Sequence, residues 1–120
     1  MLKLIYGDTG VYLERVAQTQ EAWLQQQLHL AACAGETLWQ EIAIGTLLLP
    51  LDCAGQLPPE LDWIPCDDAW LEVELTGLWL AANSQVDTGT LATEQEPEWE
   101  ALLYRLWQEQ ERIPQPPEPV

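Results

Sequence analysis

Alternation of apolar and polar residues is the main pattern along this chain. It is typical of β-strands, because neighbouring side chains of a strand point to opposite faces. The first such stretch lies at residues 1–16 and reads MLKLIYGDTGVYLERV. It predicts a hairpin with its turn at GDTG, whose glycines can adopt positive φ. Leu2, Leu4 and Tyr6 fall on one face of the first strand. Apolar residues occur on the other face too, so we expect the sheet to be covered on more than one side.

A longer alternating stretch lies at residues 69–82 and reads AWLEVELTGLWLAA. It predicts a strand with one largely apolar face. The members of that face are Leu71, Val73, Leu75, Gly77 and Trp79. The opposite face carries Trp70, Glu72 and Glu74. Because this face mixes carboxylates with apolar side chains, we expect it to be partly exposed to solvent.

Four further segments are expected to be extended or irregular. Residues 36–44 and 46–50 favour strands, with Gly45 between them marking a bulge or turn. A short strand is expected at residues 89–94. Residues 50–67 contain four prolines and no helical period, so they predict a loop. The loop should be ordered, because it has apolar side chains to bury, namely Leu57, Leu61, Trp63 and Ile64.

Two segments carry apolar residues at helical spacing. The first is predicted to begin after Thr19, which can cap the free amides, and to close at Gly35. The second begins near Pro97, where an acidic first turn complements the helix dipole. The apolar stripes consist of Trp23, Leu24, Leu28, Leu30, Ala31 and Ala34 in the first helix and Trp99, Leu102, Leu103, Leu106 and Trp107 in the second.

The order strand, strand, helix, several strands, helix predicts an α+β fold. We expect a single domain over residues 1–113, built on a twisted antiparallel sheet of about five to six strands. Two helices should pack on this sheet and cover one side of it. Residues 114–120 are rich in proline and are expected to form a flexible tail.

The net charge of the chain limits the kinds of partner that it can bind. Twenty acidic residues face four basic ones, which gives a formal net charge of -16. Residues 60–120 hold fourteen of the acids and two of the basic residues. A field of this sign disfavours direct binding to nucleic acid and steers basic partners to the surface, although it also serves solubility alone.

The sequence offers little for catalysis. His29 is the one histidine and lies within the first predicted helix, so no nucleophile has an evident base. There is no GxSxG, GxGxxG or GxxxxGK motif. Cys33, Cys53 and Cys66 show no metal or disulfide spacing, and we expect Cys33 to be a buried apolar residue. We therefore expect a protein that is not an enzyme and has no cofactor.

Acidic and aromatic residues gather around the predicted proline-rich loop. Asp62, Asp67 and Asp68 could meet a hard cation, but their spacing does not match an EF-hand, and we predict no metal site. An aromatic and acidic surface can instead take up a basic peptide or an arginine side chain through cation–π and charge-assisted contacts. Packing of the loop against the sheet is the alternative. The predicted partner-binding residues are Trp63, Asp67, Asp68, Trp70, Glu72 and Glu74.

Several segments together resemble a family of small uncharacterised proteins from cyanobacteria. They read MLKLIY, VYLERVAQTQEAW, GTLLLPLD, WLEVELTGLWLA and LLYRLWQE, and they span most of the chain. The resemblance implies a soluble single-domain protein in a photosynthetic bacterium. It carries no assigned active site and so implies no residue roles. A part in the assembly or regulation of photosynthetic complexes would follow from that setting.

Three function classes are compatible with these observations. The first is a non-enzymatic binding or assembly module that presents an acidic face to a basic protein or peptide. The second is a nucleic-acid mimic that inhibits a basic protein. The third is a small-ligand carrier or enzyme with a pocket lined by tryptophans. A second copy could also cover a sheet edge and form a homodimer. The longest apolar run, GTLLLPL, is too short for a membrane span and no signal peptide is evident, so we expect a cytoplasmic protein.

Overall fold

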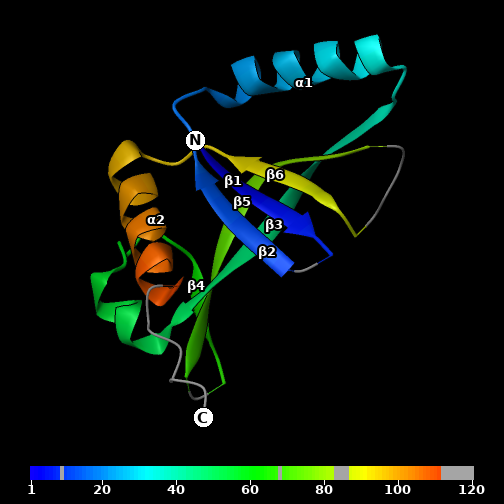
Figure 1. Cartoon of the computed structure of the whole chain (residues 1–120). Helices are drawn as coiled ribbons and strands as arrows, with labels where there is room; N and C mark the ends of the chain where they lie inside the picture. Colours follow the sequence, from blue (N-terminus) through cyan, green and yellow to red (C-terminus); the bar gives the residue numbers. More distant parts are fainter. Residues whose placement is uncertain (9, 68, 83–86, 112–120) are drawn as a thin grey trace, which may run out of the picture.

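Six antiparallel strands form one sheet within residues 1–8, 10–67, 69–82 and 87–111, which this computed structural model describes. Two long helices flank the sheet (Figure 1), which confirms the predicted α+β class. The elements are β1 (Leu2–Gly7), β2 (Gly10–Arg15), α1 (Gln20–Ala34), β3 (Leu38–Pro50), the 3-10 helix η1 (Leu51–Gln56), β4 (Trp63–Cys66), β5 (Trp70–Ala82), β6 (Gly89–Thr93) and α2 (Pro97–Glu111). The predicted tail at residues 114–120 lies outside the described residues.

The strands lie in the order β2–β1–β6–β5–β3, and β4 pairs with one end of β5. β5 pairs with β3 along its whole length, from Ala82 opposite Leu38 to Trp70 opposite Pro50. β6 and β4 therefore share the other side of β5, at its two ends. This arrangement leaves β3 as one outer strand of the sheet and β2 as the other.

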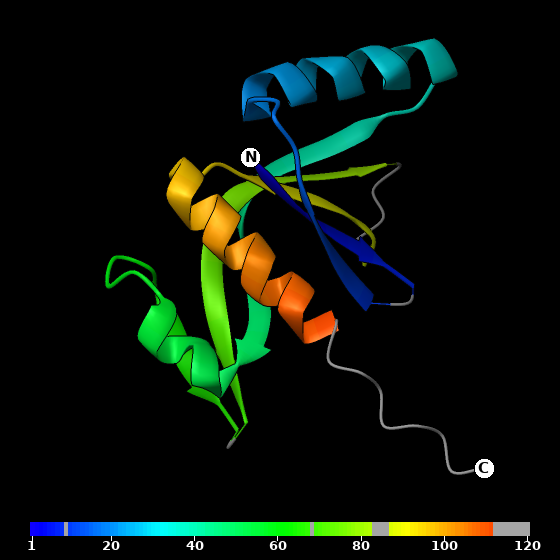
Figure 2. The same cartoon turned by 60° about the vertical axis from the view of Figure 1, so that its left-hand side comes forward.

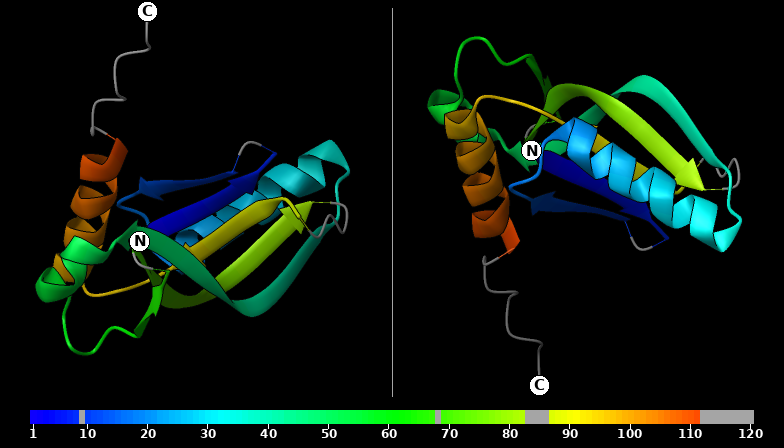
Figure 3. Two further views of the ribbon diagram at one scale, coloured as in Figure 1. Left: turned by 90° about the horizontal axis from the view of Figure 1, so that it is seen from below. Right: turned by 90° about the horizontal axis from the view of Figure 1, so that it is seen from above.

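Gly45 lies inside β3 without interrupting it, so the predicted bulge or turn is wrong and both predicted segments form one strand. The glycine is required for another reason. A Cβ at this position would overlap the side chain of Leu91 and lie 2.9 Å from the Tyr6 hydroxyl. Two strands separate β1 from β3 in the sheet, so this approach requires strong curvature. Figure 3 shows β3 and β5 curving together.

The main core fills the concave face of the curved sheet and is closed by α2 (Figure 2). The predicted apolar face of β5 is confirmed, with Leu71, Val73 and Leu75 fully buried. Leu103 and Leu106 of α2 are also fully buried, which confirms the apolar stripe of the second helix. Burial of such side chains from both layers is the main stabilising term of this part of the fold.

α1 lies against the face opposite α2, so the expectation that both helices cover one side is wrong. Trp23 of α1 packs with Met1, Leu80 and Ala92. Ala92 directly follows Leu91, which belongs to the core beneath α2. Neighbouring residues of a strand point to opposite faces, so the two clusters lie on opposite sides of the sheet.

The ends of α1 are as predicted, but only part of its apolar stripe is buried. Thr19 caps the first turn, and Gly35 closes the helix in the left-handed conformation with φ of 71°. Trp23 and Ala31 are buried, whereas Leu30 is 53% exposed. The helix extends beyond the edge of the sheet in Figures 1 and 2, which explains why its outer half finds little to pack on.

The segment predicted as an ordered loop contains regular structure. Leu51–Gln56 form a short 3-10 helix, and Trp63–Cys66 form β4. Leu57 and Leu61 are buried, as predicted, and Trp63 is half-buried, but Ile64 is 50% exposed, so its predicted burial is wrong. Among the described strands β4 pairs with β5 alone, so Pro65 is compatible with it, because a proline is tolerated where one side of a strand makes no ladder bonds.

Candidate functional site

The residues predicted to bind a partner are divided between the two faces of the sheet. Trp63 is half-buried and packs against the core beneath α2. Trp70 lies opposite Cys66, which is three positions from Trp63 and so points to the other face. Glu72 and Glu74 share the face of Trp70. The structure therefore groups Trp70 with the two glutamates and separates Trp63 from them.

The face around Trp70 is apolar as well as acidic. Trp70 is 37% exposed, and Glu72 lies between Leu48 of β3 and Ile64 of β4, both of which are exposed. A hydrogen bond with Glu72 and the negative charge of that carboxylate raise the pKa of the Cys66 thiol. This surface agrees with the expected exposure of the acidic side of β5, and its binding role stays a prediction.

The remaining acidic candidates lie in and around the connection from β4 to β5. Asp67 occupies the turn between β4 and β5 with φ of 70°, a conformation that aspartate tolerates better than most residues. Asp68 lies outside the described residues. Among the described residues, no three His, Cys, Asp or Glu side chains are grouped so as to hold a metal ion. On α1, Cys33 Sγ lies 3.8 Å from His29 Nε2. Cys33 is exposed, so its predicted burial is wrong.

A second, unpredicted site lies on the concave face next to the edge of β3. We call it the aromatic groove; it is formed by Tyr6 from β1, Trp39 and Glu41 from β3, Trp79 from β5 and Asp87 before β6. Its volume is about 500 Å³. The remaining lining residues are Ala43, Ile44, Gly45, Thr46 and Leu91.

Strand pairing positions the residues of the aromatic groove. Glu41 lies directly opposite Trp79 in the β3–β5 pair, and Trp39 is two residues away on the same face. The ring of Tyr6 meets that of Trp79 edge-on, with centroids 5.4 Å apart and planes at 66°. A Cβ on Gly89 would lie 2.7 Å from the Trp79 ring, so this glycine lets β6 approach the indole closely.

Tyr6 is held in place within the lining of the aromatic groove. Its hydroxyl is hydrogen-bonded to the backbone of Thr46 in β3, across the concave face. Burial raises the pKa of Tyr6, and the hydrogen bond from Thr46 partly opposes that shift. The phenol therefore stays neutral at physiological pH, and its ring adds a third aromatic surface to those of Trp39 and Trp79.

The chemistry of the aromatic groove suits a cation. Aromatic ring faces are electron-rich and attract ammonium and guanidinium groups. Glu41 and Asp87 are exposed carboxylates, and neither forms an ion pair with any residue that the structure describes. A positively charged group could therefore meet rings and carboxylates at once.

Sequence reasoning missed this groove because its members come from distant parts of the chain. The sequence places Trp39 and Glu41 in an extended segment without indicating a role, and it places Trp79 on the core face of its strand. The available signal was the alternation in residues 38–43, which places Trp39 and Glu41 on one face. Only the register with β5 shows that this face meets Trp79.

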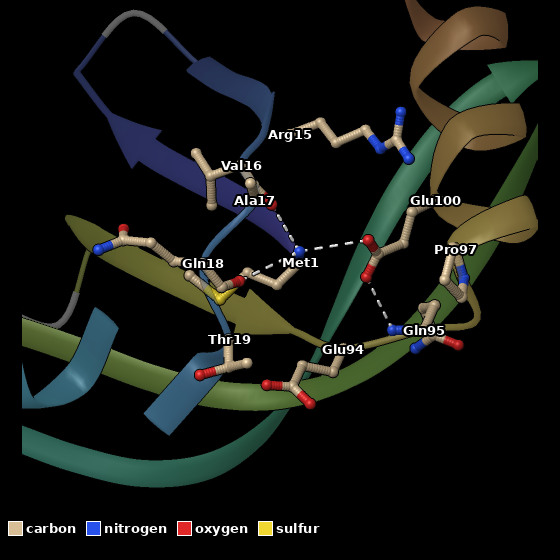
Figure 4. Close-up of a pocket in the computed structure, with 10 residues that line it drawn as sticks. All are labelled: Met1, Arg15, Val16, Ala17, Gln18, Thr19, Glu94, Gln95, Pro97 and Glu100. Atoms are coloured by element: carbon tan, nitrogen blue, oxygen red, sulfur yellow. Dashed lines mark hydrogen bonds and ion pairs between the residues drawn. The ribbon is translucent and has the colours of Figure 1, made fainter. Parts of the chain in front are cut away.

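Another groove, of about 550 Å³, lies where β2 leads into α1 and β6 leads into α2 (Figure 4). The Met1 amine lies at its centre, donates to the Val16 carbonyl at 2.7 Å and pairs with Glu100 Oε1 at 3.2 Å. Glu100 Oε2 accepts from the Gln95 amide at 3.0 Å. These central groups satisfy one another, so this site joins elements of the fold and is less suited to a ligand.

The chain matches no curated protein and no solved structure. Within the described residues, no helix combines the length and apolar character needed to cross a bilayer. One family model, described as Alr0857-like, matches residues 1–111. Alr0857 is a locus of the cyanobacterium Anabaena, which confirms the resemblance to a cyanobacterial family. The chain therefore belongs to the Alr0857-like family.

Proposed function

We propose that the protein is a non-enzymatic binding module that takes up a basic side chain of a partner protein in the aromatic groove. The observation that carries this proposal is the pairing of Glu41 with Trp79, which brings an acidic and an aromatic residue to adjacent positions in the lining of the groove. A guanidinium or ammonium group over such a ring gains about 0.5–2 kcal/mol, depending on how far it is desolvated. The nearby carboxylates add a charge-assisted contact.

The charge of the whole chain supports the same partner. A formal net charge of -16 attracts basic surfaces at a distance and speeds their association, especially at low ionic strength. The three free cysteines suit the cytoplasm, where we place the protein. Because the family is cyanobacterial, a partner from the assembly or regulation of photosynthetic complexes is the setting that we favour.

A small-ligand carrier is the second candidate function. The aromatic groove has a volume of about 500 Å³, which falls within the range of known ligand sites. Three aromatic rings with two carboxylates would select a cationic metabolite, such as one with a quaternary ammonium group. The groove is open to solvent along β3, however, and that shape favours a side chain delivered by a larger partner.

The test uses the indole N–H signals of the seven tryptophans in a ¹⁵N-labelled sample, assigned by single Trp→Leu variants. Acetyl-arginine methylamide is the probe, and the matched citrulline compound, which lacks the charge, is the control. We expect arginine to shift the signals of Trp39 and Trp79 and citrulline to shift them much less. Trp70 is a matched reference, because it and Trp39 are both 37% exposed.

Two results would contradict the proposal. One is an equal response to arginine and citrulline, since it would remove the role of charge. The other is a response confined to Trp70, since it would move the site to the outer face of β5. A free quaternary ammonium compound that binds more tightly than the arginine compound would favour the carrier instead.

A further inference from the structure

β3 has a free edge whose backbone groups are open to pairing. Within the part of the chain that the structure describes, β3 pairs only with β5. Glu74 lies opposite Thr46, and its N–H donates to the Asp62 carbonyl at 2.9 Å, on the side of β5 away from β3. In an antiparallel pair, two directly opposed residues either bond to each other or both direct their N–H and C=O groups away from the pair. The Glu74 N–H points away from β3, so Thr46 directs its backbone groups to the free edge. The even-numbered residues of β3 therefore face the free edge, and those before Thr46 are Leu38, Gln40, Ile42 and Ile44.

Between Ile42 and Leu49 this edge lacks the features that usually protect outer strands from pairing, such as charges, prolines and bulges. Glu41 is the one charged residue of Leu38–Ile44, and its side chain lies on the concave face. Residues 42–49 read IAIGTLLL and contain no charged side chain. The register with β5 runs without a bulge as far as Pro50. Ile42 is 74% exposed and Ile44 is 66% exposed. Exposed apolar side chains beside free backbone groups favour the addition of another strand.

A strand added at this edge would meet different chemistry on its two faces. On the concave side it would lie beside Trp39 and Glu41, and thus along the aromatic groove. On the outer side it would lie beside Ile42 and Ile44. Because side chains of a strand alternate between faces, its residues would have to alternate between groups that suit these two surfaces.

We infer that the partner supplies an extended segment that pairs with β3 along Leu38–Ile44, with basic and apolar residues in alternation. The basic residues enter the aromatic groove, and the apolar residues pack on Ile42 and Ile44. This inference rests on the proposed function, because it takes the basic group from that proposal and adds the form in which it arrives. Main-chain hydrogen bonds supply affinity, and alternate side chains supply specificity.

The hydroxyl of Tyr6 marks one end of the pairing segment. It is bonded to the Thr46 backbone, so the added strand can pair freely only up to Ile44. From Leu38 to Ile44 the edge spans seven residues, which is roughly 20–25 Å of extended chain.

Charge favours such a partner over a second copy of this chain. A second copy would bring a second body of formal net charge -16 to the same edge. Like charges repel at this range, whereas a basic segment gains from Glu41 and Asp87. A second copy paired through β3 is therefore the disfavoured occupant of this edge.

The experiment measures amide hydrogen exchange in the ¹⁵N-labelled protein with an acetylated and amidated heptapeptide in which arginine and valine alternate. We expect exchange to slow by about tenfold or more at Leu38, Gln40, Ile42 and Ile44, because these amides gain partners. Trp39, Glu41 and Ala43 direct their amides to β5 and should change little. The indole signals of Trp39 and Trp79 should shift in the same titration.

The two proposals fail in different ways. Shifts at the indoles without slower exchange at the even-numbered amides would overturn strand addition and leave recognition of a basic side chain standing. If a peptide with citrulline in place of arginine bound equally tightly and slowed exchange equally, the requirement for a basic side chain would be overturned in both proposals. Protection of the same amides in the free protein, together with a dimer in sedimentation equilibrium, would make a second copy the occupant and overturn the inference.

A peptide and a variant complete the test. A heptapeptide of the same composition, with its arginines and valines in separate blocks, should bind about tenfold more weakly, and equal binding would overturn the alternation. Ile42→Lys places a positive charge on the edge and should lower the affinity for the alternating peptide by about tenfold. Leu48→Lys is the matched control, because Leu48 lies on the same face of β3 beyond Thr46 and should leave binding unchanged.

Discussion

Glu41 and Trp79 occupy directly opposed positions of the β3–β5 pair, although 38 residues separate them in the chain. Opposed residues of antiparallel strands have their Cβ atoms about 4.5–5.5 Å apart. Glu41 and Trp79 therefore extend from neighbouring backbone positions into the same groove, where a bound cation can meet both side chains. This relationship makes the aromatic groove the best candidate for a binding site.

Glu41→Gln should weaken binding of the arginine compound about three- to tenfold, since it removes one charge-assisted contact of about 1 kcal/mol. Glu74→Gln is the control, because Glu74 is also exposed and lies on the outer face of β5. Both variants lower the net negative charge equally, so long-range attraction changes equally. Titrations followed by the indole signals give the two affinities, and equal losses in both variants would contradict a local role for Glu41.

Gly45→Ala should destabilise the fold by about 1–3 kcal/mol, because the added methyl group overlaps the Leu91 side chain inside a packed core. Gly55→Ala is the matched control, since nothing lies within 4 Å of the position its Cβ would take. Urea denaturation, monitored by tryptophan fluorescence, gives the free energy of unfolding of both variants. A Gly45 variant as stable as the Gly55 variant would mean that β1, β6 and β3 do not approach as closely as described.

Glu100→Ala should lower the free energy of unfolding by about 3 kcal/mol, because it leaves the buried Met1 amine without its carboxylate. It also removes the acceptor of the Gln95 amide. Glu98→Ala, an exposed position in the same turn of α2, should change stability little. Thermal unfolding of the two variants at the same pH makes the comparison, and similar midpoints would show that the Met1–Glu100 pair contributes little.

Leu103→Ala and Leu30→Ala should differ strongly, although both leucines lie on helical apolar stripes. Leu103 is fully buried beneath the sheet, and its truncation should cost about 2–5 kcal/mol. Leu30 is 53% exposed on α1, and its truncation should cost less than about 1 kcal/mol. Chemical denaturation tests both. A large loss at Leu30 would indicate that the outer half of α1 packs on another surface in solution.

Stability should fall as the pH rises above 10 because of Tyr6. Burial raises the pKa of this phenol above its ordinary value of 10.0, so the folded protein holds the proton after the unfolded chain has released it. The unfolded state then binds fewer protons, and the free energy of unfolding decreases with pH. Tyr6→Phe should make this fall shallower while losing about 1 kcal/mol at neutral pH with the Thr46 hydrogen bond. Unfolding measured between pH 7 and pH 11 gives both effects, and an unchanged slope in the variant would assign the alkaline loss to other groups.

Much of the fold was predictable because it depends on local patterns. Alternation in β1, β2 and β5 and the stripe of α2 reflect burial on one face, which a sequence records directly. The caps of α1 at Thr19 and Gly35 were predictable for the same reason, since they satisfy backbone groups of their own segment. The acidic side of β5 is exposed, as its mixed composition indicates.

The predicted site was less accurate, because proximity along the chain is a poor guide to shared faces. Trp63 and Trp70 are seven residues apart, yet the register of β4 with β5 places them on opposite faces. Gly45 resembles a strand break, but its small size serves contact with Leu91, which is 46 residues away. Neither relationship leaves a local signal.

The sequence by itself determined the α+β class, the amphipathic elements, the acidic surface and the lack of familiar catalytic motifs. These properties follow from composition and from the repeat distance of each kind of element. The tertiary structure alone decided that α1 and α2 lie on opposite faces, that β3 is an outer strand of the sheet and that Tyr6, Trp39 and Trp79 line one groove. Those features depend on strand register and sheet curvature, which arise from contacts between residues far apart in the chain.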